Sequence, residues 1–362
     1  MINIPEKDLM RFAELMKSKI EQIESHPDKP WFDPDGGGGL PQNMQGRVYN
    51  GINHFCLSLL CDDKEYKTPV FMTFLQVKEQ NAKVKKGECA FPVIFWHFSY
   101  KDEDGRKISR EEYEQLSKAA QVKCTVSAYS KTYPVFNIEQ TTFPEDQPEK
   151  WEKLQKKFAA PDLKDEKGML CCPVLDKMIE DKRWVCPIHL ELSDNAFYRP
   201  SSDDIHLPLK GQFRSGESFY STMLHEMGHS TGHESRLDRL KPARFGSHDY
   251  GVEELVAEMT AAVSGKALGL PTNLQEENAN YLKIWLQAID TEPKFIFNIL
   301  SDVGKASNMI LGEVDKISRE LDVTKSNELA KDCSLGVQTG NGIENKKGRI
   351  NLKYLISCYQ LI

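Results

Sequence analysis

The segment Phe219–His229, which reads FYSTMLHEMGH, contains the pattern HExxH and predicts an α-helix that carries a metal site. Residues four apart on a helix lie one above the other on the same face. His225 and His229 can therefore bind one ion, while Glu226 lies about a third of a turn away, near any water on the ion's open position. Apolar residues recur every four positions in this segment, and Gly232 predicts the end of the helix.

A third metal ligand is expected further along the chain, because a catalytic zinc normally has three protein ligands and one open position. Six positions after the second histidine, where metzincin peptidases have a third histidine, this chain has Ser235. The segment 247–271, which reads SHDYGVEELVAEMTAAVSGKALGLP, is the better source of a ligand. Its apolar stripe, with a stop at Gly269 and Pro271, predicts a second helix.

Two glutamates lie one turn apart on this second helix, at positions 254 and 258. The spacing resembles the gluzincin arrangement, in which one glutamate binds the metal and a later carboxylate orients a metal-bound histidine. We therefore assign Glu254 as the third ligand and Glu258 as the orienting carboxylate. Glu253 is the alternative for either role.

A site of two histidines and one glutamate favours hydrolytic chemistry. Zinc lowers the pKa of a bound water molecule to about 7, and Glu226 would take the water proton as general base and deliver it to the leaving amine. Manganese or cobalt can replace zinc, since affinity order and metal availability decide the ion in the cell. Three residues are candidates for the donor that stabilises the oxyanion, although each also suits a structural role: His233, His248 and Tyr250.

The segment 196–208 precedes the metal-binding helix and predicts two short strands around a turn at Pro200–Asp203. An edge strand beside the active-site helix can pair with an extended peptide. An ordinary packing hairpin is equally compatible with the same residues.

The whole chain has the composition of a globular protein. It has 362 residues, of which 40% are hydrophobic and 28% charged. No run reaches the roughly 18 apolar residues of a membrane span, and we interpret the N-terminal segment as an amphipathic helix and not as a secretion signal. The nine cysteines form no CxxC pair, so we expect free thiols and a cytoplasmic location.

Composition divides the chain into parts, and the predicted fold class is α+β. A mixed α/β domain is followed by a mainly helical domain with a small sheet. A polar, proline-punctuated segment between them predicts a linker, and the last forty residues lose periodicity and predict a disordered tail. The expected boundaries are 1–142 for the first domain, 143–168 for the linker, 169–322 for the second domain and 323–362 for the tail.

Three segments of the first domain combine amide, basic and aromatic side chains. They are LPQNMQGRVYNGIN at 40–53, NAKVKKG at 81–87 and KTYPVFN at 131–137. Aromatic rings stack on unpaired bases and lysines follow the phosphate backbone, although strands with solvated lysines explain the composition equally well. The net charge of −7 gives no overall sign of nucleic-acid binding, so any such site is a local patch.

The run at 40–53 resembles the opening motif of the ArdC-type antirestriction proteins. Later segments resemble the same family in the same order, from about residue 31 to 311. They are KGE from position 86, YPVFNIEQ from 133, AFYRPSSDDI from 196, HEMGHSTGHESRLDR from 225 and YGVEELVAE from 250. The chain departs from the family pattern at Gln45, where threonine is usual, and at Ser230, where tryptophan is common.

The resemblance implies an N-terminal domain that binds single-stranded DNA and a zincin-like metallopeptidase domain that acts on an unidentified protein. Such proteins help incoming DNA to escape restriction, here during conjugation. The residues that would form or support the DNA-facing loop are Trp31, Arg47, Tyr49, Asn50, Asn53, Lys85 and Lys86. Their alternative role is to form turns, which the Gly-Ile-Asn run favours whatever binds there.

Three other functions remain open at the level of sequence. The protein can be a DNA-anchored repair protease, whose activity single strands stimulate, or a regulatory peptidase that is indifferent to DNA. In the third alternative the metal site is non-catalytic and DNA binding alone protects. Glu226 argues mildly against the third, because a structural site needs no general base.

Overall fold

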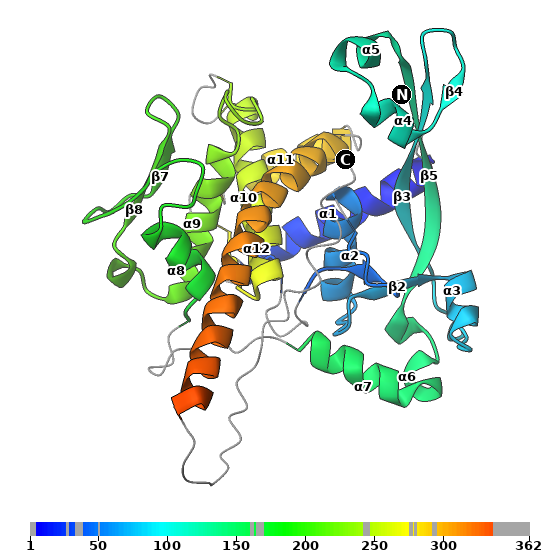
Figure 1. Ribbon diagram of the computed structural model, residues 1–362, viewed down its shortest axis with the longest axis horizontal. Coiled ribbons are helices and arrows are strands. Elements are labelled where there is room, and N and C mark those ends of the chain that lie inside the picture. Colours follow the sequence, from blue (N-terminus) through cyan, green and yellow to red (C-terminus); the bar gives the residue numbers. More distant parts are fainter. Residues whose placement is uncertain are drawn as a thin grey trace.

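The computed structural model describes residues 5–26, 29–32, 39–49, 51–159, 163, 170–241, 247–274, 278, 281–291 and 295–335. It contains two separate sheets with helices packed around them (Figure 1), which confirms the predicted α+β class. We call residues 5–159 the N-terminal part and residues 170–335 the C-terminal part.

The N-terminal part is built on a five-stranded sheet with the order β1-β2-β5-β3-β4. Its elements are α1 (Glu6–Ser25), β1 (Gln42–Asn43), α2 (Gly51–Asp63), β2 (Val70–Thr73), α3 (Phe74–Glu79), β3 (Phe91–Lys101), β4 (Lys107–Ile108), α4 (Arg110–Gln115), α5 (Lys118–Lys123) and β5 (Thr125–Asn137). Strands β3 and β5 are antiparallel along their whole paired length. They are rich in the β-branched and aromatic residues that suit a pleated surface.

Helix α1 packs with one apolar face against α2 and the start of β3. Phe12, Met16, Ile20 and Ile23 recur at helical spacing and are all buried. The ring of Phe12 meets Phe91 of β3 edge to face at 5.4 Å, so the first helix is fixed to the start of the longest strand pair.

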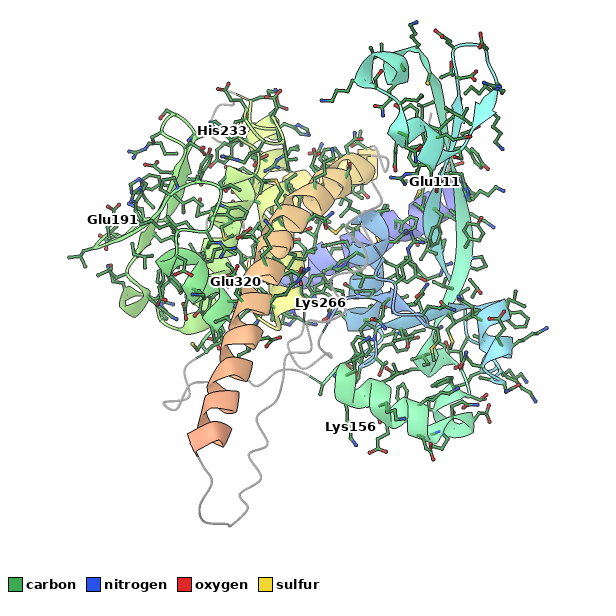
Figure 2. The ribbon with its side chains drawn as sticks, in the orientation of Figure 1. Glu111, Lys156, Glu191, His233, Lys266 and Glu320 are labelled. Atoms are coloured by element: carbon green, nitrogen blue, oxygen red, sulfur yellow. The ribbon has the colours of Figure 1, made fainter. Side chains whose placement is uncertain are left out.

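The structure differs from the expected linker over residues 143–158. After η1 (Ile138–Gln140), this stretch forms α6 (Phe143–Asp146) and α7 (Pro148–Lys157). Trp151, Leu154 and Phe158 of this stretch pack inward on the cluster that holds Val70 and Met72. Lys156 lies on the outer side of the helix (Figure 2). The segment looks polar because α7 exposes most of its surface, yet one apolar edge is enough to hold it on the N-terminal part.

The C-terminal part is mainly helical with a three-stranded sheet of order β6-β8-β7. Its elements are α8 (Pro173–Glu180), β6 (Ile188–Glu191), β7 (Phe197–Arg199), β8 (Asp204–Pro208), η2 (Lys210–Gln212), α9 (Gly216–Ser230), α10 (His248–Leu268), α11 (Leu282–Thr291) and α12 (Phe295–Leu335). The two predicted strands at 196–208 and both predicted helices are confirmed. Strand β7 forms an edge of the small sheet and lies against α9.

The two parts share a hydrophobic core. One buried cluster joins Phe12 and Phe55 of the N-terminal part to Met259, Trp285 and Val303 of the C-terminal part. Helix α12 contacts α2 on one side and α8, α9 and α10 on the other, and it runs through the middle of the molecule (Figure 1). Helix α10, one of the two helices that carry the candidate metal ligands, therefore shares a hydrophobic cluster with elements that precede the expected linker.

Helix α12 continues to Leu335, beyond the expected start of the tail at residue 323. The rest of the predicted tail, 336–362, lies outside the described residues. Among the residues that are described, no helix is long and apolar enough to cross a membrane.

Candidate metal centre

Helix α9 positions the three residues of the HExxH pattern. Its first turn is capped by Ser215, whose hydroxyl accepts a hydrogen bond from the Ser218 backbone N–H at 3.2 Å. A Cβ added at Gly228 would lie 3.1 Å from the Cα of Ala257 on α10. Glycine at this position therefore lets α9 and α10 approach closely enough for their side chains to meet at one point.

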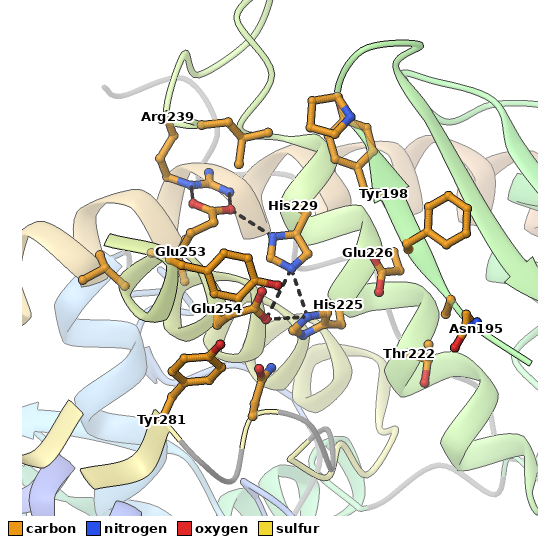
Figure 3. Close-up of a pocket in the computed structure, with 18 of the residues that line it drawn as sticks. Asn195, Tyr198, Thr222, His225, Glu226, His229, Arg239, Glu253, Glu254 and Tyr281 are labelled. Carbon is orange, nitrogen blue, oxygen red and sulfur yellow. Dashed lines mark hydrogen bonds and ion pairs between the residues drawn. The ribbon is translucent and has the colours of Figure 1, made fainter. Parts of the chain in front are cut away.

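His225, His229 and Glu254 converge between the two helices (Figure 3). The two imidazole Nε2 atoms lie 3.1 Å apart. The Glu254 Oε2 atom lies 3.4 Å from Nε2 of His225 and 3.6 Å from Nε2 of His229. Four tetrahedral ligands at about 2.0–2.1 Å from a zinc ion lie about 3.3 Å from one another. The three atoms thus have the separations of a zinc coordination sphere, although their role as ligands stays a prediction.

The outer ring nitrogens of both histidines face carboxylates. Nδ1 of His229 lies 3.1 Å from Oε1 of Glu253, and Nδ1 of His225 lies 3.7 Å from Oε1 of Glu258. The Glu253 carboxylate at Nδ1 of His229 holds the ring proton there, which leaves the Nε2 lone pair for a metal. Nδ1 of His225 is buried and has no hydrogen-bond partner among the described residues, because Glu258 lies beyond hydrogen-bond distance. Glu258 lies where the sequence predicts an orienting carboxylate. Glu253 lies in the same position on the other histidine and not among the three converging atoms.

The convergence places three electron-rich atoms around a small space, and a cation is the simplest way to balance them. Burial lowers the pKa of His229, but its contacts with Glu253 and Glu254 outweigh burial and raise the pKa well above its usual value. Burial raises the pKa of Glu254, but its contacts with both histidines lower it further than burial raises it. Protonated histidines thus supply the positive charge that a bound divalent ion would otherwise supply to these carboxylates.

Two further side chains hold the orienting carboxylates, and sequence reasoning missed both. Arg239 donates from Nε and Nη2 to the two oxygens of Glu253 at 2.7 and 2.8 Å. Asn278 donates from Nδ2 to Oε1 of Glu258 at 2.9 Å. Arg239 lies only ten residues after His229, inside the HEMGHSTGHESRLDR run. Its positive charge could have indicated an ion pair with Glu253, the glutamate that the assignment of ligands left without a role. Asn278 gave no such signal, because it lies 20 residues after Glu258 in the sequence, beyond the end of the second helix.

The three converging atoms open onto a cavity of about 910 Å³. Its lining includes Glu226, His225 and His229 together with residues of β7 and the loop before it. Figure 3 shows Glu226 on the side of the cavity that faces Asn195 and Tyr198, away from Glu253. Glu226 is buried yet reaches the cavity, so the predicted general base lies where a water molecule or a scissile bond would enter.

The structure separates the three candidate oxyanion donors. Tyr250 lines the cavity, and burial together with Glu254 raises the pKa of its hydroxyl, which keeps the proton in place for donation. His233 is hydrogen-bonded to Ser235 in the loop after α9, and His248 is exposed beside Asp249. Of the three residues, only Tyr250 lies at the cavity.

The predicted DNA-binding residues do not form one exposed surface. Trp31, Tyr49 and Asn53 are buried, and the Asn53 side chain exchanges two hydrogen bonds with the backbone of Ile94 in β3. These three residues belong to the N-terminal core, which corrects the expectation that Tyr49 and Asn53 face DNA. The supporting role of Trp31 stays a prediction.

Three of the four other predicted residues can be placed. Arg47 and Lys86 are exposed. Lys85 donates to the backbone oxygen of Glu139 and forms an ion pair with Glu145. Asn50 lies outside the described residues. For Arg47 and Lys86, a role in DNA binding stays a prediction.

A second group of ligand-type side chains lies on the small sheet: His189, Asp204 and His206. Arg199 Nη2 lies 3.0 Å from Oδ2 of Asp204 and 3.0 Å from Nε2 of His206. The guanidinium therefore occupies the space between these atoms and satisfies them without an ion, so we assign no metal to this cluster.

Two families of known proteins match separate segments of the chain. Residues 8–136 match a family described as the N-terminal domain of anti-restriction factor ArdC, and residues 175–302 match a family described as zincin-like metallopeptidase. A DNA primase TraC of Escherichia coli is 29% identical over 328 residues, which are 88% of this chain and 29% of that protein. The chain thus spans less than a third of this curated relative's length.

Two solved structures are similar over most of the chain. One is the metal-free crystal structure of the antirestriction protein ArdC from the R388 plasmid, with a TM-score of 0.60 and 27% identity, covering 84% of this chain and 98% of that one. The other is the Mn(II)-bound structure of the same protein, with a TM-score of 0.60 and 26% identity, covering 84% and 97%. The similarity extends to a protein that holds a divalent metal.

Proposed function

The chain belongs to the ArdC-type antirestriction proteins, and on that premise we propose that it is a zinc-dependent peptidase that also binds single-stranded DNA. The observation that carries the peptidase proposal is the convergence of His225, His229 and Glu254 at zinc-like separations beside Glu226. We assign the first three as ligands and Glu226 as general base. Manganese or cobalt can serve in place of zinc.

The residues around the cavity have the roles that amide hydrolysis requires. A bound divalent ion would polarise the scissile carbonyl and acidify a water molecule. Glu226 takes the proton of that water and passes it to the leaving amine. The Tyr250 hydroxyl lies at the same cavity and donates a hydrogen bond to the oxygen on which negative charge develops.

Strand β7 gives the cavity a means of holding an extended peptide. It is the edge of the small sheet, pairs with β8 on one side only, and contributes Phe197 and Tyr198 to the cavity lining. A peptide that adds to this edge through main-chain hydrogen bonds would run past Glu226. The substrate is therefore an extended or unfolded stretch of a protein.

We place the DNA-binding function in the N-terminal part, which includes residues 143–158 because α6 and α7 pack on its core. The proposed zinc ligands and general base all lie in the C-terminal part, which begins at residue 170. The protein would act on DNA that enters the cell as a single strand during conjugation. Support for this setting comes from the plasmid origin of the similar antirestriction protein.

The peptidase proposal is tested by comparing the wild-type protein with Glu226→Gln, both loaded with zinc. Each is added to a cell extract with and without a single-stranded oligonucleotide, and new protein N-termini are identified by mass spectrometry. Glu226 is not an assigned ligand, so both proteins should hold equal metal, and only the wild type should generate new termini.

The outcomes separate the alternatives. Cleavage that needs the oligonucleotide indicates a protease that acts at DNA, and cleavage of one protein regardless of DNA indicates a regulatory peptidase. The same termini from both proteins at equal metal content would show that the site is not a peptidase, and DNA binding alone would then remain.

A further inference from the structure

Strands β3 and β5 form a long ribbon that extends from the N-terminal core to β4, α4 and α5 (Figure 1). Residues directly opposite each other in the register share a face, and alternate residues lie on opposite faces. One face of the ribbon carries a histidine, two tyrosines and three lysines. We call this the lysine face and define it by these residues: His97, Ser99, Lys101, Lys107, Ser127, Tyr129, Lys131 and Tyr133.

A continuous row of rings runs along the lysine face. The Phe95 ring, which lies on the same face nearer the core, meets Tyr133 at 5.5 Å. The Tyr133 hydroxyl is hydrogen-bonded to Nε2 of His97 at 3.3 Å. His97 is stacked on Tyr129 at 5.1 Å with only 15° between the rings. Tyr129 ends the row with 47% of its surface exposed, so its ring offers a surface on which a planar base can stack.

The row of rings also reaches the loop that the sequence singles out. The ring of Tyr49 meets Phe95 edge to face at 6.4 Å. Arg47 is two residues away from Tyr49 and is exposed. The loop that carries the exposed Arg47 is thus packed, through the buried Tyr49, on the end of the row of rings that lies nearer the core.

All charged side chains of the lysine face are positive. Lys101 and Lys107 lie directly opposite each other in the register of β3 and β4, which costs stability unless an anion balances them. Lys131 lies over the Tyr129 ring at 5.7 Å. None of these three lysines has an ion pair with a carboxylate within the described part of the chain. Three positive charges along a row of rings fit a flexible polyanion that carries bases.

The opposite face of the ribbon differs in character. Phe98 and Tyr100 lie there, and Tyr100 packs on Tyr113 of α4 at 4.7 Å. At the tip of the ribbon, Glu103 forms an ion pair with Lys123. Within α4, Arg110 forms an ion pair with Glu114. The opposite face thus combines packing with self-paired charges and provides no row of free cations.

We propose that the lysine face is the surface that binds single-stranded DNA, with bases stacked at Tyr129 and His97 and phosphates held by Lys101, Lys107 and Lys131. The inference rests on the proposed DNA-binding function and names its site. Base stacking on aromatic rings and phosphate contacts to lysines are the two interactions that hold single strands without sequence preference. Duplex DNA cannot stack on these rings in the same way, because the faces of its bases are already stacked on the neighbouring base pairs.

The test is fluorescence anisotropy of a labelled oligothymidylate with the full chain, at several salt concentrations. Tyr129→Ala should weaken binding roughly tenfold, and Tyr129→Phe should retain wild-type affinity because the ring remains. Lys131→Gln should reduce the slope of log affinity against log salt by about 0.7. The matched control is Phe98→Ala, which removes an equally exposed ring, at 52%, from the opposite face.

Each outcome decides one question. If the wild-type protein binds no oligonucleotide, the proposed DNA-binding function fails. If the wild type binds but Tyr129→Ala and Lys131→Gln bind as tightly, or if Phe98→Ala weakens binding as much as Tyr129→Ala, the lysine face is not the site. Thermal unfolding of each variant shows that a loss of binding is not a loss of the fold.

Discussion

At the scale of single residues, the metal centre depends on which nitrogen of each histidine carries the proton. Glu253 and Glu258 face the Nδ1 atoms, so the Nε2 atoms face each other across 3.1 Å. Arg239 then fixes Glu253 with two hydrogen bonds and adds a third contact to the Gly228 carbonyl at 2.9 Å. The same arginine thereby ties the orienting carboxylate to the turn of α9 that carries the histidines.

This arrangement predicts that Glu253→Gln lowers metal affinity. The amide cannot hold the His229 proton as a carboxylate does, and loss of such outer partners typically costs 10–100-fold in affinity. Competition with a chromogenic chelator measures the affinity for zinc. The matched control is Glu226→Gln, which removes a carboxylate from the same cavity and should leave zinc affinity unchanged. Equal affinities for Glu253→Gln and the wild type would contradict the orienting role.

At the scale of elements, the site is made by the close approach of α9 and α10. Gly228 allows that approach, and Ser215 and Ser247 cap the two helices with side-chain hydrogen bonds to the Ser218 and Tyr250 backbone N–H groups. The caps fix where each helix begins, and the glycine fixes how near they lie. Both features place Glu254 within reach of the histidines.

Two glycine substitutions with opposite expected signs test this packing. Gly228→Ala should destabilise the protein by about 1–3 kcal/mol, because the new methyl group would press on Ala257. Gly312→Ala in α12 should stabilise it by about 0.5–1 kcal/mol, because a Cβ there has open space and alanine favours the helix. Urea denaturation measures both. A neutral Gly228→Ala would show that the two helices can separate freely.

Sequence periodicity predicted the two helices that form the site, but it did not predict which side chains their residues pair with. The spacing at 219–229 and 247–271 gave both helices, because burial of one helical face leaves a pattern along the chain. The pairing of Arg239 with Glu253 was missed because it depends on how the loop after α9 folds back. The exposure of Tyr49 and Asn53 was misjudged because a motif identifies residues without saying whether they are exposed. The α7 helix was missed because its apolar edge is narrow.

At the scale of the whole molecule, the two parts share one of their hydrophobic clusters. Trp285 of α11 is fully buried in that cluster and donates from Nε1 to the Gly251 carbonyl at 2.7 Å. Burial of large apolar residues from both parts in one core predicts cooperative unfolding, since neither part keeps its core when the other opens. The sequence suggested two separate domains because contacts between distant segments leave no local pattern.

Trp285→Ala tests the shared core. We expect a loss of about 3–5 kcal/mol, and hydrogen exchange of α1 amides should accelerate by the same free energy as that of α10 amides. Denaturation of the wild type should give one transition. Protection of α1 that survives the substitution while α10 loses it would show that the parts unfold independently.

Helix α10 has a further consequence that follows from its position. Leu255, Val256 and Met259 pack in the cluster shared with the N-terminal part, while Glu254 and Glu258, on adjacent turns, face the histidines. A helix is stiff over such a distance, so a displacement that DNA imposes on α1 or α2 would shift these carboxylates by a similar amount. Occupancy of the DNA surface and the strength of the metal site would then be reciprocally linked, with each ligand altering the affinity for the other by the same factor.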